Sequence, residues 1–230
     1  DGSFTINIPL YHHTQVRMMI GKADLVILLS PEKETNVAIN LSNPPGKQFV
    51  FSGQYATINN EWCQPELITK IPPVYSDGDL LDSIVGISAN EFKKRCINQY
   101  KRYVTHNNAQ LQFSEDTRTL ANLSCAFDCL ENLQATHYCL QTAYQKKENI
   151  TREQAFAAFL DVYLPDDFHN YLKDFPVNHP LALYCYNYRN VVMDLYDTHK
   201  DPLAYEKNLL KNAPLTKEEQ TLIHQYETAF

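Results

Sequence analysis

Glycine is scarce in this chain, with six residues among 230. Tight hairpin turns need positive φ angles, which glycine adopts most easily, so a tightly turned all-β fold is disfavoured. Apolar runs are short, and none approaches the roughly 18 residues that a membrane-spanning helix needs. The hydrophobic fraction of 44% and the charged fraction of 20% are typical of a folded domain and exclude a disordered one.

The motifs of common enzymes and cofactor sites are also missing. The sequence has no glycine-rich nucleotide loop, no HExxH zinc motif, no GxSxG nucleophile elbow and no CxxC pair. His12-His13-Thr14 contains the H-x-T triplet of two-histidine phosphoesterases, but the second triplet that these enzymes need is absent. We therefore expect no cofactor and no metal ion.

Positive charge is in deficit, because 20 Lys and Arg face 27 Asp and Glu, and the net charge is −7. Nucleic-acid binding needs a positive surface, so we expect no nucleic-acid partner. The six cysteines do not form a disulfide pattern, since Cys125, Cys129 and Cys139 fall in one predicted helix. Reduced thiols indicate a cytoplasmic, reducing compartment.

The ends of the chain and its asparagine content suggest a context. The chain lacks an initiator methionine and a leader, and its last residues are typical of a helix, so we expect a fragment of a larger cytosolic chain. Nineteen asparagines and few glycines indicate an AT-rich microbial source. A bacterial effector delivered into a host cell is compatible with this composition.

Residues 4 to about 58 show strand patterns. Phe4, Ile6 and Ile8 alternate with polar residues, which predicts a half-buried strand. Further strands are predicted over residues 16–20, 25–29, 37–41 and 49–51. The short turns between them favour an antiparallel meander.

From about residue 79 the pattern is helical. Capping boxes predict three helix starts, at Ser88 with Glu91, at Thr151 with Gln154 and at Thr216 with Glu219. Apolar stripes of period 3.6 predict long helices over residues 117–145 and 180–199. The fold class is α+β, with a small N-terminal antiparallel sheet followed by a larger multi-helix region. We divide the chain into a β-rich lobe (1–63), a proline-containing connector (64–79) and an all-helical lobe (80–230), which are also compatible with one packed domain.

Cys63 is the best candidate for a catalytic residue. A thiol at a helix start has a lowered pKa, and a nearby histidine can act as its base. Cys63 precedes a predicted short helix over residues 65–68, and His179 is the histidine that we pair with it. This pair predicts a thiol-dependent hydrolase or transferase, and the alternative is a buried thiol beside Trp62, the lone tryptophan.

The predicted helix over residues 88–105 concentrates positive charge, with five of the 20 Lys and Arg within ten residues. Helical spacing places Lys94, Arg95, Lys101 and Arg102 opposite the apolar face. Such a face predicts binding to an acidic partner or to anionic lipid. The alternative is an ordinary solvated helix face.

Pro72-Pro73-Val74-Tyr75 is the most specific short motif in the chain. It resembles the Pro-Pro-x-Tyr ligand motif of WW domains, which bind an exposed polyproline-II segment. The resemblance implies a WW-type partner, and the alternative is a stiff connector whose Tyr75 packs on the helices. With no catalytic motif and two candidate docking segments, we predict a protein-interaction module that binds a protein partner.

Overall fold

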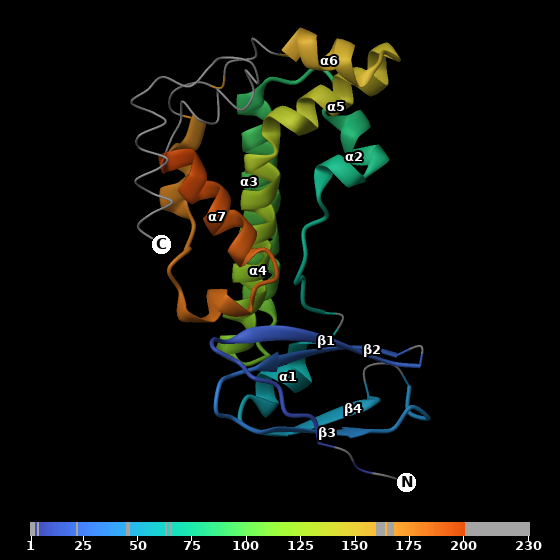
Figure 1. Cartoon of the computed structure of the whole chain (residues 1–230), viewed down its shortest axis with the longest axis vertical. Helices are drawn as coiled ribbons and strands as arrows, with labels where there is room; N and C mark the ends of the chain where they lie inside the picture. Colours follow the sequence, from blue (N-terminus) through green and yellow to red (C-terminus); the bar gives the residue numbers. More distant parts are fainter. Residues whose placement is uncertain are drawn as a thin grey trace, which may run out of the picture. The chain divides into compact units, whose positions relative to one another are not determined.

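The computed structural model describes residues 3, 5–21, 23–44, 47–62, 64, 66–159, 164 and 168–200. Residues 1–191 form one compact unit and residues 192–230 form another. The first unit begins with small antiparallel sheets and continues with helices (Figure 1), which confirms the predicted α+β fold. The predicted boundaries at residues 63 and 79 stay predictions.

The strands pair as two hairpins. Strand β1 (Thr14–Ile20) pairs with β2 (Ala23–Leu29), and β3 (Thr35–Ile39) pairs with β4 (Phe49–Gly53), both antiparallel. Among the described residues the two hairpins share no strand pairing, so they form two sheets where the sequence favoured one meander. Residues 5–8, predicted as a strand, form none.

The apolar faces of the two hairpins share a small core. Leu25, Ile27 and Phe51 are its buried centre, and Val37 packs against them. Gly53 has a φ of +92°, and a Cβ atom there would lie 2.9 Å from the Glu34 carbonyl oxygen. Only glycine therefore fits where β4 ends.

Helix α1 (Ala56–Trp62) joins the hairpins through two asparagines. Asn59 accepts a hydrogen bond from the Leu28 amide at 2.7 Å and donates one to the Leu28 carbonyl at 3.1 Å. Asn60 makes the same two bonds with Phe51, at 2.8 and 3.1 Å. The Asn59 side chain thus satisfies the outward-facing main-chain groups of one residue of β2, and Asn60 does the same for one residue of β4.

Long helices make up most of the remaining described chain. In order, the elements are η1 (Val74–Ser76), α2 (Gly78–Ser83), α3 (Ala89–Ala109), α4 (Glu115–Gln134), α5 (Thr136–Glu148), α6 (Arg152–Phe159), η2 (Phe168–Asp174), η3 (Pro180–Tyr184) and α7 (Tyr188–Lys200), where η marks a 3-10 helix. Helices α3 and α4 lie side by side (Figure 1). Their contact buries Phe92 of α3 and Leu120, Phe127 and Leu130 of α4.

Of the predicted capping boxes, the one at Thr151 forms with both of its bonds, and the one at Ser88 forms the bond to the serine hydroxyl. The Ser88 hydroxyl accepts from the Glu91 amide at 3.2 Å, and Thr151 and Gln154 bond each other reciprocally. The third box, at Thr216, and the residues after 200 lie outside the described part of the chain.

Two predicted helices are each interrupted. The helix expected over residues 117–145 is split into α4 and α5 at Ala135, whose ψ of 8° leaves helical geometry. The helix expected over residues 180–199 begins as η3, and Cys185 is extended (φ −74°, ψ 129°) before α7 starts. In both places the apolar pattern continues across the break, so its period does not reveal the break.

Candidate functional site

The exposed face of α3 carries the cations that the sequence singled out. The helix starts at the Ser88 cap and buries Phe92 and Cys96. Lys94, Arg95, Lys101 and Arg102 are all exposed. The structure therefore places the four predicted residues on the side of α3 that faces away from the core.

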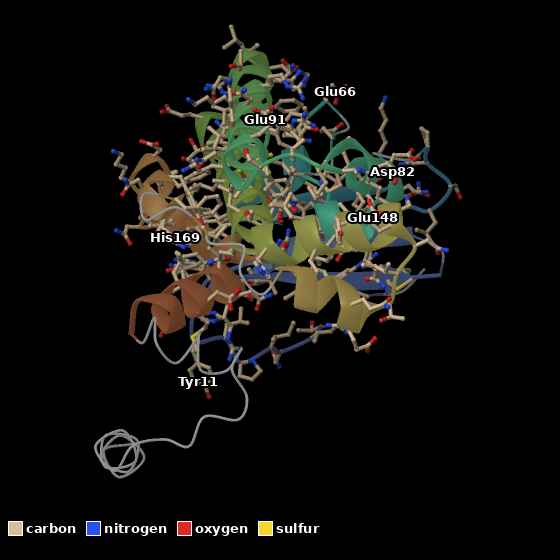
Figure 2. The ribbon with its side chains drawn as sticks, turned by 90° about the horizontal axis from the view of Figure 1, so that it is seen from above. Tyr11, Glu66, Asp82, Glu91, Glu148 and His169 are labelled. Carbon is tan, nitrogen blue, oxygen red and sulfur yellow. The ribbon has the colours of Figure 1, made fainter. Side chains whose placement is uncertain are left out.

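Two cations of α3 are already engaged within the chain. Arg95 donates to the Ser83 carbonyl at 2.7 Å and pairs with Glu91, labelled in Figure 2, at 3.2 Å. Lys93 donates to the Phe168 carbonyl at 3.1 Å, and its ammonium lies 4.8 Å from the centre of the Phe168 ring. These two side chains hold neighbouring segments against α3 and are poorly available to a partner.

The side chains of Lys94, Lys101 and Arg102 make no hydrogen bond or ion pair with any described residue. An open depression on the same face is lined by Asn98, Lys101, Arg102 and Thr105, which are spaced as one helix face. The Thr105 hydroxyl donates to the Lys101 carbonyl at 2.9 Å, so the donors left for a ligand are the two cations and the Asn98 amide. This donor set suits carboxylate or phosphate oxygens.

The connector that contains the WW-like motif lies against α3 and α4. The main-chain amides of residues 68, 71 and 74 each donate to a helix side chain, namely Asn107, Asp128 and Asn132, at 2.9, 2.7 and 2.8 Å. Asn107 and Asn132 also donate to connector carbonyls, at 2.9 and 3.3 Å. Side chains on the helices thus bind the connector as they would bind an extended peptide.

Within this connector Pro72 is exposed, and Pro73 is half-buried and extended (φ −68°, ψ 126°). The Tyr75 ring is half-buried, its hydroxyl donates to Glu131 at 3.2 Å, and burial raises its pKa. Binding to a WW domain would require Tyr75 to leave Glu131. The WW-type partner stays a prediction.

A buried polar network continues from the connector into the helices. Asn187 donates to Asp128 at 2.8 Å and to Glu131 at 2.7 Å. Burial raises the pKa of Asp128 to about 6, although the bonds from Ile71 and Asn187 act in the opposite direction. Asp128 accepts from the Ile71 amide and from Asn187, and Glu131 accepts from the Tyr75 hydroxyl and from Asn187. Because every donor belongs to this chain, the arrangement is that of a structural network.

A polar cluster that the sequence did not predict ties the start of β1 to η3. The Ser30 hydroxyl lies 2.8 Å from His13 Nδ1 and 2.5 Å from the Tyr184 hydroxyl. Tyr55, with a φ of +62°, packs edge-on against Tyr184. A serine beside a histidine is a possible nucleophile, but Ser30 is only 4% exposed and Tyr184 only 2%. The cluster is therefore structural, and no local signal predicts it, because its members are far apart in sequence.

The predicted catalytic pair is not assembled by the described residues. Cys63 lies outside them, and His179 is exposed and caps η3 by accepting from the Leu181 amide at 3.2 Å. Burial raises the pKa of every described thiol, to about 12 for Cys96, Cys125 and Cys139, and further for Cys129 and Cys185. These five thiols are protonated at neutral pH and are poor nucleophiles.

The Cys63 hypothesis therefore stays a prediction, and iodoacetamide labelling followed by mass spectrometry tests it. If Cys63 is catalytic, it alkylates at near-neutral pH far faster than the five buried thiols. A Cys63 that is as slow as those five would contradict a thiol-dependent reaction.

Other binding chemistry is limited in the part of the chain that the structure describes. No three or more His, Cys, Asp or Glu side chains are grouped there in a way that could hold a metal ion. No helix there is long and apolar enough to span a bilayer.

No protein-family model, curated protein or solved structure matches this chain. Any assignment of function must therefore come from the chain's own surfaces.

Proposed function

We propose that this chain is a protein-interaction module whose α3 face binds an acidic segment of a partner protein. The observation that carries the proposal is a group of three cations, Lys94, Lys101 and Arg102, that share one exposed helix face and pair with none of the described residues. The chain as a whole has a net charge of −7. A local positive surface attracts acidic segments of partner proteins.

The spacing of the cations sets the size of the partner segment. Lys94 and Arg102 are eight residues apart, about 12 Å along a helix axis. An extended peptide covers that distance in about four residues, since each adds roughly 3.3 Å. A segment with acidic residues at both ends of such a stretch would pair with Lys94 at one end and with Lys101 and Arg102 at the other.

The absence of apolar anchors on this face favours a protein segment over a lipid surface. Helices that lie on membranes place Trp, Phe or Leu beside their cations, so that apolar side chains enter the bilayer. No large hydrophobic residue of α3 is exposed, and Asn98 and Thr105 lie beside the cations on the same face. An interface built only from charges and small polar groups suits an acidic peptide.

The test uses a labelled oligoglutamate peptide as the probe, with binding measured by fluorescence anisotropy. Reversing Lys94, Lys101 and Arg102 to Glu removes three attractions, each worth roughly 0.2–1 kcal/mol when exposed. We expect affinity to fall by about tenfold or more. Affinity should also weaken as salt rises, because exposed charges are screened beyond about 8 Å at physiological ionic strength.

A matched variant separates local charge from net charge. Reversal of Lys33, Lys47 and Arg152, which are exposed and lie away from α3, changes the net charge by the same amount. The control should lose little affinity. Equal losses in the two variants, or binding that salt does not weaken, would contradict the proposal. Vesicles with and without phosphatidylserine form a second arm, and preferential binding to the anionic vesicles would point to lipid instead.

A further inference from the structure

The N-terminal arm, residues 5–8, has a strand pattern but no strand partner. Ile6 and Ile8 are 59% and 44% exposed, and the residues between and before them are polar. Tyr11, labelled in Figure 2, is 96% exposed. Pro9 follows the arm directly and limits a strand to the four residues before it. The arm therefore has the sequence pattern of a short amphipathic strand, with both isoleucine side chains exposed.

The edge of β3 that faces away from β4 pairs with no described strand. Phe51 of β4 directs its amide and carbonyl to Asn60, so it does not exchange them with its register partner Val37. Hydrogen-bonded and non-bonded pairs alternate along an antiparallel ladder. The main-chain groups of Thr35, Val37 and Ile39 therefore point away from β4, and no described residue bonds to them.

The other three edges are less suited to accept a strand. Asn59 occupies the β2 edge and Asn60 occupies the β4 edge. The β1 edge carries Arg17, and a charged side chain is a usual device against strand addition. Strand β3 contains no charge and no proline, and Figure 1 shows it on the side of β4 away from α1.

We propose that residues 5–8 of one copy add as a strand to the β3 edge of a second copy, and that the exchange is reciprocal. In the added strand Ile6 and Ile8 share one face, as Val37 and Ile39 do on β3. Val37 packs against the hairpin core and Ile39, on the same face of β3, is half-buried, so the isoleucines of the added strand extend this apolar face outward.

We favour a second copy of this chain over another partner because a second copy would pair both the exposed arm and the open β3 edge. Among the described residues of a single chain, neither the arm nor the β3 edge pairs with a strand. A two-fold exchange pairs both arms with both edges and then closes, which limits assembly to a dimer. This surface is distinct from the α3 face, and the proposal does not depend on the acidic partner.

The experiment compares the full chain with two variants by light scattering after size exclusion, over a range of concentrations. The arm variant is Ile6→Asp with Ile8→Asp, and the control is Met19→Asp, which changes an exposed apolar residue of β1. We expect the wild type and the control to reach twice the mass of the 26.6-kDa chain, while the arm variant stays monomeric. Amide hydrogen exchange at Val37 and Ile39 should be slow in the dimer and fast in the arm variant.

Three results would overturn the proposal. One is a wild type that is monomeric at every concentration with fast exchange at Val37. Another is a monomer with slow exchange at Val37, which would place the arm on the edge of its own chain. The third is an arm variant that remains dimeric. Native circular dichroism and a cooperative thermal transition in each variant show that the comparison is between folded proteins, because the substituted side chains are exposed.

Discussion

Asn59→Ala removes the side chain that bonds both main-chain groups of Leu28. Asn59 is 1% exposed and Leu28 is fully buried, so water cannot replace either bond. A buried polar group that loses its partner costs roughly 1–3 kcal/mol. With two groups affected, the free energy of unfolding should fall by about 2–6 kcal/mol. That is a large share of the roughly 5–15 kcal/mol that stabilises a typical domain.

Substitutions of two other asparagines serve as comparisons for the stability that Asn59→Ala loses. Asn60→Ala breaks the equivalent bonds to Phe51, but Asn60 is half-buried and water can reach part of the site, so we expect a loss of about 1–2 kcal/mol. Asn108→Ala changes an exposed side chain on α3 that only accepts from Asn122, and should cost less than about 0.5 kcal/mol. Urea unfolding, followed by the fluorescence of Trp62 on α1 and by far-ultraviolet circular dichroism, measures all three.

Asn59→Asp separates hydrogen bonding from volume, because the two side chains have nearly the same shape. An ionised carboxylate can accept from the Leu28 amide but cannot donate to its carbonyl, and its charge would be buried. Burial should raise the pKa of the new carboxyl, so the variant gains stability relative to the wild type as the pH falls through that pKa. A cost of Asn59→Ala no larger than that of Asn60→Ala would contradict this prediction. So would a stability deficit of Asn59→Asp that does not shrink in acid.

Further predictions address the connector, its buried acid and the end of β4. Burial raises the pKa of Asp128 from 3.8 to about 6, so the folded chain keeps a proton that the unfolded chain has lost between those values. Relative to Asp128→Asn, the wild type should therefore gain about 3 kcal/mol in unfolding free energy as the pH falls from about 7 to about 4, and a constant difference in urea unfolding would contradict this. Tyr75→Ala should cost about 2 kcal/mol, since a half-buried ring is lost, whereas an unchanged melting curve with loss of binding to an isolated WW domain would support the docking hypothesis. Gly53→Ala should lower the melting temperature more than Gly21→Ala, because both have positive φ but only a Cβ at Gly53 meets the Glu34 carbonyl, and equal shifts would show that this contact relaxes freely.

The features that the sequence predicted well depend on neighbours along the chain. The strands predicted over residues 16–20 and 25–29 lie within β1 and β2, because a short turn and apolar patterning fix a hairpin locally. The caps at Ser88 and Thr151 form because each needs only residues within one turn. Local patterns were enough to predict the α+β class.

The features that the sequence did not predict depend on distant partners. Residues 5–8 have the alternation of a strand, but a strand also needs an edge to pair with, and no described strand of the same chain pairs with them. The exposure of the α3 cations follows from helical spacing. Helical spacing does not predict the hydrogen bond that Arg95 donates, because its acceptor is the Ser83 carbonyl at the end of α2, which lies before the cap of α3.

Asparagines at buried helical positions are a feature of the sequence that indicates some of these long-range contacts. Asparagine is disfavoured inside helices, because its side chain competes for main-chain hydrogen bonds. Asn59, Asn107 and Asn132 nevertheless occupy buried helical positions, and each bonds both a main-chain amide and a main-chain carbonyl of an extended segment. A side-chain amide has one acceptor and donors arranged like a peptide group, so it can stand in for a strand where none is available. An asparagine on the apolar face of a predicted helix therefore indicates that an extended segment lies against that helix. Asn98 and Asn108, on the exposed face of α3, hold no such segment.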